Sequence, residues 1–221
     1  NNMVKVRERK YFLGSIQSEK LIRLNGLKKV DPHSNQLYSM ACKFLNKYQK
    51  IKIDKAYSFA KKIKYKHGNM SPEIYFAHPK RVSALSMLLY DNNNIDAAIL
   101  GLIHNVFELT SRDEKEISLL FGSKISKQAF VLTVDRQFQW DRDYKKEYYE
   151  KISSGPIESS VIKVLDKVDN LFILGTNPDS EIKYRYLKEI EDYIVPMTSK
   201  SIPSLSNYLE RLIEYNYKNS F

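Results

Sequence analysis

The sequence is poor in cysteine, glycine and proline. Cys42 is the only cysteine among 221 residues, which excludes an internal disulfide and a zinc site built on cysteines. Seven glycines and seven prolines provide few turns, and apolar residues recur at intervals of three and four almost throughout the chain. Because this spacing is typical of amphipathic helices, the sequence predicts an all-α protein.

Long apolar runs are also missing. No stretch approaches the ~18 consecutive apolar residues that a membrane-spanning helix needs. The charged segment 1–10 lacks the apolar stretch of a secretory signal. We therefore expect a cytoplasmic protein that makes no contact with membranes.

Basic residues outnumber acidic ones. Thirty-six Lys and Arg against 26 Asp and Glu give a net charge of +10, which would attract polyanions or a highly charged phosphate substrate. The basic residues are interleaved with acids, as in the segment 145–151, and they form no nucleic-acid motif. A solvated surface is therefore favoured over a nucleic-acid interface, and RNA binding is an alternative that depends on the net charge alone.

The length of the chain suits one well-buried domain. Residues 1–35 are weakly patterned and are treated as an N-terminal extension without assigned structure, whereas residues 36–221 are expected to form a single helical domain. The pattern predicts helices over 37–48, 56–63, 79–89, 95–110, 114–121 and 125–133, a loop and a helix over 135–155, and helices over 161–172, 180–194 and 203–217.

Several polar side chains interrupt these apolar segments. His104 and Glu108 are four residues apart and share one helix face, and Asn105 lies three residues before Glu108. Asp166 lies among apolar neighbours on a helix face that is expected to be buried, where an ionised carboxylate needs a partner. His78 precedes Pro79, which suits the first turn of a helix, so His78 is expected at or beside the start of that helix.

Together these side chains predict a metal pocket. If His78 meets the residues at 104, 105 and 166, two imidazoles, one carboxamide and one carboxylate surround a single point. Imidazole and carboxylate ligands suit Mn, Fe, Zn or Ni, so the ligand types do not name the metal.

Each residue also has an ordinary structural explanation. A buried histidine such as His104 is more often hydrogen-bonded in a core than bound to a metal. Glu108 could be solvated at a helix end, and Asp166 could pair with Lys163 or Lys167 on its own helix. The order and spacing of the residues as a set favour the metal pocket.

The same residues lie in motifs that resemble a known family. His78-Pro79, the segment 104–110 (HNVFELT) and the segment 164–171 (VLDKVDNL) are similar to the motifs of RelA/SpoT-type HD hydrolase domains, which remove the 3′-diphosphate from the alarmones ppGpp and pppGpp. The similarity extends from about residue 56 to the helix of Asp166. No synthetase half is visible, and the chain looks closest to the stand-alone small alarmone hydrolases. The resemblance implies an HD-domain helical bundle.

The resemblance also implies roles for individual residues. It implies a Mn²⁺ ion held by His78, His104, Asn105 and Asp166. Asn105 stands where the family has an aspartate, and because it lacks the negative charge, the metal is expected to bind weakly or not at all. The family's Glu-Asp pair, which activates water, falls on Glu108 and Leu109, and Leu109 can neither accept a proton nor orient water. Glu108 and Asn105 remain as the expected catalytic residues.

Two functions follow from these observations. The first is a metal-dependent pyrophosphohydrolase of the (p)ppGpp 3′-pyrophosphohydrolase type, acting on ppGpp or a related phosphorylated nucleotide and impaired by Asn105 and Leu109. Its substrate contacts are expected from Lys64, Lys66, His67, Lys80, Arg136 and Asn170. The alternative is a catalytically inactive HD domain with a regulatory role that binds a nucleotide, a protein partner or a second copy of itself.

Overall fold

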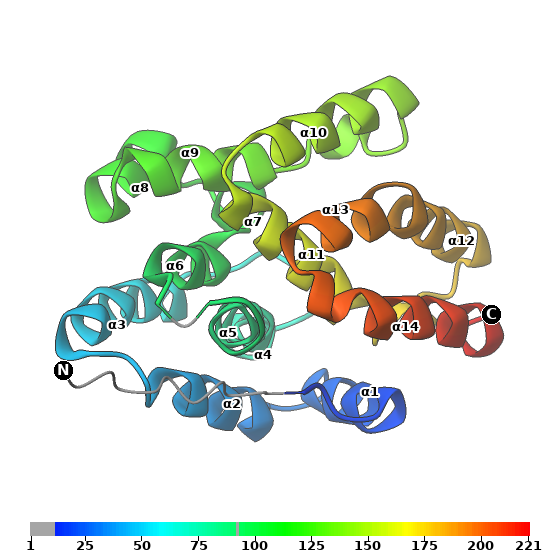
Figure 1. Ribbon diagram of the computed structural model, residues 1–221, viewed down its shortest axis with the longest axis horizontal. Coiled ribbons are helices and arrows are strands. Elements are labelled where there is room, and N and C mark those ends of the chain that lie inside the picture. The colour runs from blue at the N-terminus through cyan, green and yellow to red at the C-terminus, as the bar shows by residue number, and fades with distance from the viewer. Residues whose placement is uncertain (1–11, 92) are drawn as a thin grey trace, which may run out of the picture.

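The computed structural model describes residues 12–91 and 93–221, which fold almost entirely into helices (Figure 1). No β-strand occurs among these residues, so the all-α prediction is confirmed. None of their helices combines the length and the hydrophobicity that a bilayer-spanning segment requires. The α-helices of the described residues are α1 (Ile16–Gly26), α2 (Pro32–Cys42), α3 (Lys47–Lys61), α4 (Pro72–Tyr75), α5 (Ala77–Leu85), α6 (Ile95–Ile103), α7 (Val106–Leu109), α8 (Glu114–Phe121), α9 (Ser123–Leu132), α10 (Arg142–Ser154), α11 (Ile157–Leu171), α12 (Ser180–Glu189), α13 (Val195–Ser201) and α14 (Ser206–Asn219). Short π-helical segments, Ser86–Tyr90 and Ile190–Ile194, follow α5 and α12.

Helices α5, α6 and α11 pack against one another and form the centre of the fold (Figure 1). Helix α2 packs on α5, helices α3 and α9 pack on α6, and helices α10, α13 and α14 pack on α11. The buried apolar side chains form one continuous core that includes all three central helices. Polar residues on the central helices are therefore removed from solvent and brought close together.

The N-terminal part of the fold differs from the helix pattern expected from the sequence. The helix expected over 37–48 is two helices, because Asn46 begins α3 with a capping box in which its side chain accepts from the Gln49 N–H and the Gln49 side chain accepts from the Asn46 N–H. Within the stretch 1–35, for which the sequence predicts no element, α1 and the first turn of α2 are helical, and residues 1–11 lie outside the described residues.

The helix expected over 95–110 is interrupted at His104 and Asn105. The His104 Nδ1 donates to the Gly101 carbonyl oxygen at 2.7 Å. In a continuous α-helix that oxygen would accept from the Asn105 N–H, so the imidazole competes with the helical hydrogen bond. Helix α6 ends at Ile103, and the chain continues as the short helix α7.

Helix α6 crosses α5 at Gly101 with almost no space between the two backbones. A Cβ atom at residue 101 would lie 2.8 Å from the Ser83 Cα and 2.9 Å from the Ser83 nitrogen. The Ser83 hydroxyl donates to the Ala98 carbonyl oxygen at 2.7 Å across the same crossing. The absence of a side chain at Gly101 therefore fixes how close the helix of His78 lies to the end of α6.

Replacing Gly101 with alanine should disturb this crossing. Gly101→Ala is expected to lower the free energy of unfolding by about 1–3 kcal/mol, because α5 and α6 must separate to admit the methyl group. Urea unfolding followed by circular dichroism measures the change. An unaltered midpoint would contradict the close packing described above.

Candidate functional site

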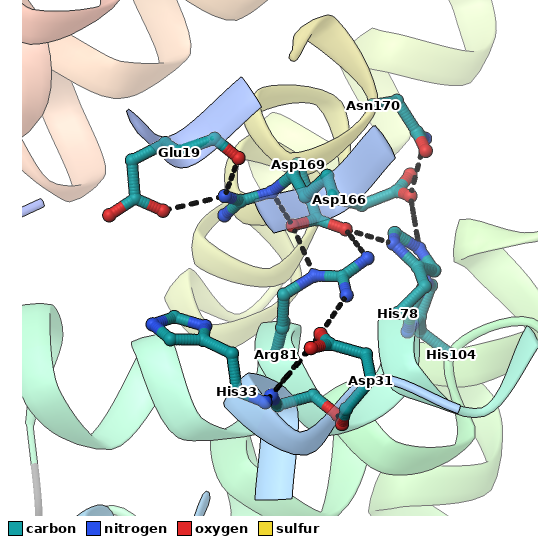
Figure 2. Close-up of polar contacts among 11 residues, drawn as sticks. Glu19, Asp31, His33, His78, Arg81, His104, Asp166, Asp169 and Asn170 are labelled. Atoms are coloured by element: carbon teal, nitrogen blue, oxygen red, sulfur yellow. Dashed lines mark hydrogen bonds and ion pairs between the residues drawn. The ribbon is translucent and has the colours of Figure 1, made fainter. Parts of the chain in front are cut away.

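Three side chains from the three central helices meet at one buried point. His78 is the second residue of α5, His104 follows the last residue of α6, and Asp166 lies on α11. Each offers one ligand atom, and the three atoms lie within 4.8 Å of one another. The Asp166 Oδ1 is 3.1 Å from the His78 Nε2 and 3.6 Å from the His104 Nε2 (Figure 2).

Both imidazoles are held in one orientation by their other ring nitrogen. The His104 Nδ1 donates to the Gly101 carbonyl oxygen, and the His78 Nδ1 lies 2.7 Å from the Asp169 Oδ2. A carbonyl oxygen can only accept, so the His104 Nδ1 carries a hydrogen and Nε2 is the nitrogen that faces Asp166. Metal-binding histidines are commonly oriented in this way by a carbonyl or carboxylate.

The chemistry of this group fits a divalent cation. The His104 Nε2 is buried and has no hydrogen-bond partner among the residues that the structure describes, although buried polar atoms are normally satisfied. A cation placed among the three ligand atoms would satisfy this nitrogen and the Asp166 carboxylate together. Two imidazoles and one carboxylate are ligands that Mn²⁺, Fe²⁺ and Zn²⁺ all accept.

Neighbouring charges favour the ionised forms of Asp166 and His78. Burial opposes the ionised form of Asp166, but Lys163 and the two histidines hold the pKa of its carboxyl well below its usual range. Burial also opposes a charge on His78, but the hydrogen bonds and charges of Asp166 and Asp169 raise its pKa to about 9. Without a metal, a proton on His78 therefore balances the carboxylate, and metal binding would release that proton.

The partner of Asp166 on its own helix is Lys163. The Lys163 Nζ lies 3.2 Å from the Asp166 Oδ2, whereas the Lys167 Nζ lies 3.2 Å from the Glu189 Oε1. The sequence allowed Asp166 to pair with Lys163 or with Lys167, and the structure contains the pair with Lys163. This pair leaves the Asp166 Oδ1 directed at the histidines, so the ion pair and the ligand geometry exist together.

A cavity of about 300 Å³ is lined by two of these three residues, His78 and Asp166. Three of the six residues proposed as substrate contacts line it, namely His67, Arg136 and Asn170. Asn170 also donates to the Asp166 Oδ1 at 3.2 Å. Three lysines that the sequence analysis did not propose as substrate contacts line the cavity as well, namely Lys145, Lys163 and Lys167.

The other three proposed contacts do not line this cavity. Lys64 and Lys66 are exposed and alternate with the buried Ile63 and Tyr65 in an extended segment, so their side chains point outward. Lys80 lies two residues after His78 on α5 and therefore faces another side of that helix. It donates to the Asn35 side chain and lines a separate cavity beneath α2.

The residues proposed for catalysis lie at the wall of the same cavity. The Asn105 Nδ2 donates to the Tyr75 hydroxyl. The Glu108 Oε1 accepts from Arg136, at 2.9 Å from Nε and 2.7 Å from Nη2. Leu109 is buried in the apolar core and brings no polar group to the cavity. Glu108, the one acidic side chain that remains of the Glu-Asp pair, is therefore bound to Arg136.

A second carboxylate, which was not predicted from the sequence, lies beside the site. Asp169 lies one helical turn after Asp166 and is bound by Arg81 and Arg23 as well as by His78. The signal in the sequence was a second aspartate three residues away on the same apolar helix face. Its partners could not be named, since Arg23 lies in the stretch that had no assignment.

Comparisons with known proteins found curated relatives of low identity and a solved structure with a similar fold. No family model matches the sequence. The chain is 28% identical over 165 residues to the guanosine-3′,5′-bis(diphosphate) 3′-pyrophosphohydrolase of Aquifex aeolicus, covering 72% of this chain and 23% of that protein. It is 26% identical over 200 residues to the enzyme of the same name from Borreliella burgdorferi, covering 87% of this chain and 29% of that protein. The chain thus spans roughly a quarter of the length of these curated relatives.

A solved structure shares the fold. It is that of a metazoan ortholog of SpoT that hydrolyses ppGpp, and it matches with a TM-score of 0.59 at 18% identity, covering 80% of this chain and 99% of that chain. The all-helical fold and the curated relatives together confirm that this chain resembles the RelA/SpoT-type HD hydrolase domains.

Proposed function

We propose that this chain is a metal-dependent pyrophosphohydrolase that removes the 3′-diphosphate from ppGpp or from a related phosphorylated nucleotide. The observation that carries the proposal is the convergence of His78, His104 and Asp166 at a buried point beside a cavity that three lysines line. The names of the curated relatives support the substrate class.

Different residues would bind the metal and the substrate. His78, His104 and Asp166 would hold the metal, Mn²⁺ or another divalent ion, and Asn105 lies at the wall of the same cavity. When bound, such a cation supplies Lewis-acid chemistry for hydrolysis at phosphorus. Lys145 and Lys167 both pair with Glu189 along the cavity, and they would neutralise the charge of a diphosphate.

Glu108 is the residue proposed to move a proton. Its carboxylate faces the cavity but is bound to Arg136, whose guanidinium is largely exposed. A diphosphate entering beside Arg136 would compete for the same guanidinium, because arginine binds phosphate as readily as carboxylate. Substrate binding would then release Glu108 to act as an acid or base.

The second candidate function is nucleotide binding without hydrolysis, in a regulatory role that includes a protein partner or a second copy of the chain. Asn105 and Leu109 favour it, since the first reduces the negative charge available to a metal and the second removes a water-orienting carboxylate. Calorimetric binding of ppGpp without turnover would support this alternative, and turnover would exclude it.

A hydrolysis assay tests the proposed function. Incubation with ppGpp and Mn²⁺ is expected to release pyrophosphate, measured by ion-exchange chromatography, and the release should stop when a chelator is added. A His104→Ala variant serves as the inactive control, because it lacks one ligand atom. If ppGpp stays intact with Mn²⁺ supplied, the proposed function is wrong.

A further inference from the structure

A buried carboxylate next to the candidate metal centre accepts hydrogen bonds at both of its oxygens. Asp169 is 2% exposed, and its Oδ1 accepts from the Arg23 Nε at 2.7 Å and from the Arg81 Nε at 2.8 Å. Its Oδ2 accepts from the Arg81 Nη2 at 2.9 Å and lies 2.7 Å from the His78 Nδ1. Figure 2 shows Asp169 beside Arg81 with His78 on its other side, directed toward Asp166.

The two arginines connect this carboxylate to the N-terminal helices. The Arg23 Nη1 donates to the Glu19 Oε2 at 2.6 Å, and the Arg23 guanidinium lies 4.1 Å from the centre of the Phe172 ring. The Arg81 Nη1 donates at 3.2 Å to Asp31, which caps the first turn of α2. Acidic and basic groups therefore alternate from α1, through α11 and α5, to the start of α2.

Stability alone does not account for a buried network of this kind. Removing charges from water costs so much that apolar residues of similar volume often stabilise a core equally well or better. An apolar residue at position 169 could not, however, accept the hydrogen of the His78 Nδ1. That bond decides which nitrogen of His78 faces Asp166, as the Gly101 carbonyl does for His104.

We propose that Asp169 is a positioning residue of the metal centre and that Arg23 of α1 holds it in place, so that helix α1 is part of the site. This inference deepens the proposed function, because it concerns how the same chain holds its metal. Loss of a hydrogen-bond partner outside the ligand shell typically weakens metal binding ~10- to 100-fold. Asp169→Asn should weaken it within that range, and Arg23→Gln by about 10-fold, since Arg81 still holds the carboxylate.

Calorimetric titration of the full chain with Mn²⁺, without nucleotide, tests the proposal. Asp192→Asn and Lys28→Gln are the matched controls, because each makes the same charge change at an exposed residue that does not line the cavity. The controls should bind Mn²⁺ like the unaltered chain. Affinities of Asp169→Asn and Arg23→Gln within twofold of their controls would overturn the proposal.

A second readout separates positioning from a merely structural role. The melting temperature of each variant is measured with and without saturating Mn²⁺. A structural defect lowers both temperatures and leaves the metal-induced rise unchanged, whereas weaker metal binding reduces the rise itself, since ligand stabilisation depends on the dissociation constant. An unreduced rise in Arg23→Gln would overturn the role of α1.

An NMR measurement on the unaltered chain tests the positioning of His78 by Asp169 even if a variant fails to fold. In the Zn²⁺-loaded protein, long-range proton–nitrogen NMR should show His78 with its hydrogen on Nδ1 and its metal on Nε2. Metal on Nδ1, or no binding of either metal, would overturn the proposal. If Mn²⁺ binds but ppGpp stays intact, the proposed function fails while the affinity series still decides the role of Asp169.

Discussion

Asp166→Asn is expected to abolish Mn²⁺ binding and to lower the free energy of unfolding of the metal-free chain by about 3–5 kcal/mol. The loss of stability follows from Lys163, which is 5% exposed and depends on the Asp166 carboxylate at 3.2 Å. The carboxamide leaves that buried ammonium without an opposite charge. Calorimetry measures the binding, and urea unfolding without metal measures the stability.

A double variant separates the two effects. Asp166→Asn combined with Lys163→Met removes both charges of the pair and keeps a side chain of similar length, so most of the lost stability should return. Mn²⁺ binding should stay absent, since the carboxylate ligand is still missing. Recovery of metal binding in the double variant would show that Asp166 is not a ligand.

Asn105→Asp is expected to strengthen Mn²⁺ binding by ~10- to 100-fold, or about 1.4–2.8 kcal/mol. A full negative charge about 4 Å from a unit cation is worth roughly 4 kcal/mol at the effective dielectric of a protein surface, and removing the new carboxylate from water offsets part of this gain. The Tyr75 hydroxyl, which accepts from Asn105, can donate to an aspartate instead. The new side chain therefore keeps a hydrogen-bond partner.

Calorimetry and the ppGpp assay measure this change together. Asn207→Asp is the control, because it adds the same charge at an exposed residue of α14. Faster hydrolysis by Asn105→Asp would mean that the other catalytic residues are intact. Tighter metal binding without hydrolysis would instead point to Leu109, which is 8% exposed within the apolar core and offers no group to orient water. If Asn105→Asp binds Mn²⁺ no more tightly than the unaltered chain, residue 105 does not lie beside the metal.

The sequence predicted the helical fold and the three residues that converge. His104 and Asp166 could be recognised because each is a polar residue in an apolar segment, and such residues need partners wherever the chain folds. His78 could be recognised from its place before Pro79, in a motif that resembles that of the HD hydrolase domains. The periodicity also located most helices, but it missed α1 and α13. Pro196 was interpreted as a boundary, although a proline is tolerated in the first turn of a helix, where it lies in the structure.

Long-range contacts and side-chain directions could not be predicted in the same way. Periodicity places a residue on one face of one helix and contains no information about the element that covers that face. Arg23 reaches Asp169 across 146 positions of sequence. The sequence analysis predicts Lys80 as a substrate contact, yet the turn of α5 directs it to a separate cavity.

The span of the Asp169 network has a consequence for biosynthesis. Chains are made from the N-terminus at about 5–20 residues per second, so Arg23 and His78 are synthesised well before Asp166 and Asp169. Their pairing closes a long loop, and its entropic cost rises by about 0.6 kcal/mol for each doubling of length. A nascent chain that ends before α11 has neither carboxylate, so it can expose both histidines but cannot form the centre. The proposed metal could then be bound only after α11 has been made and has docked against α5 and α6.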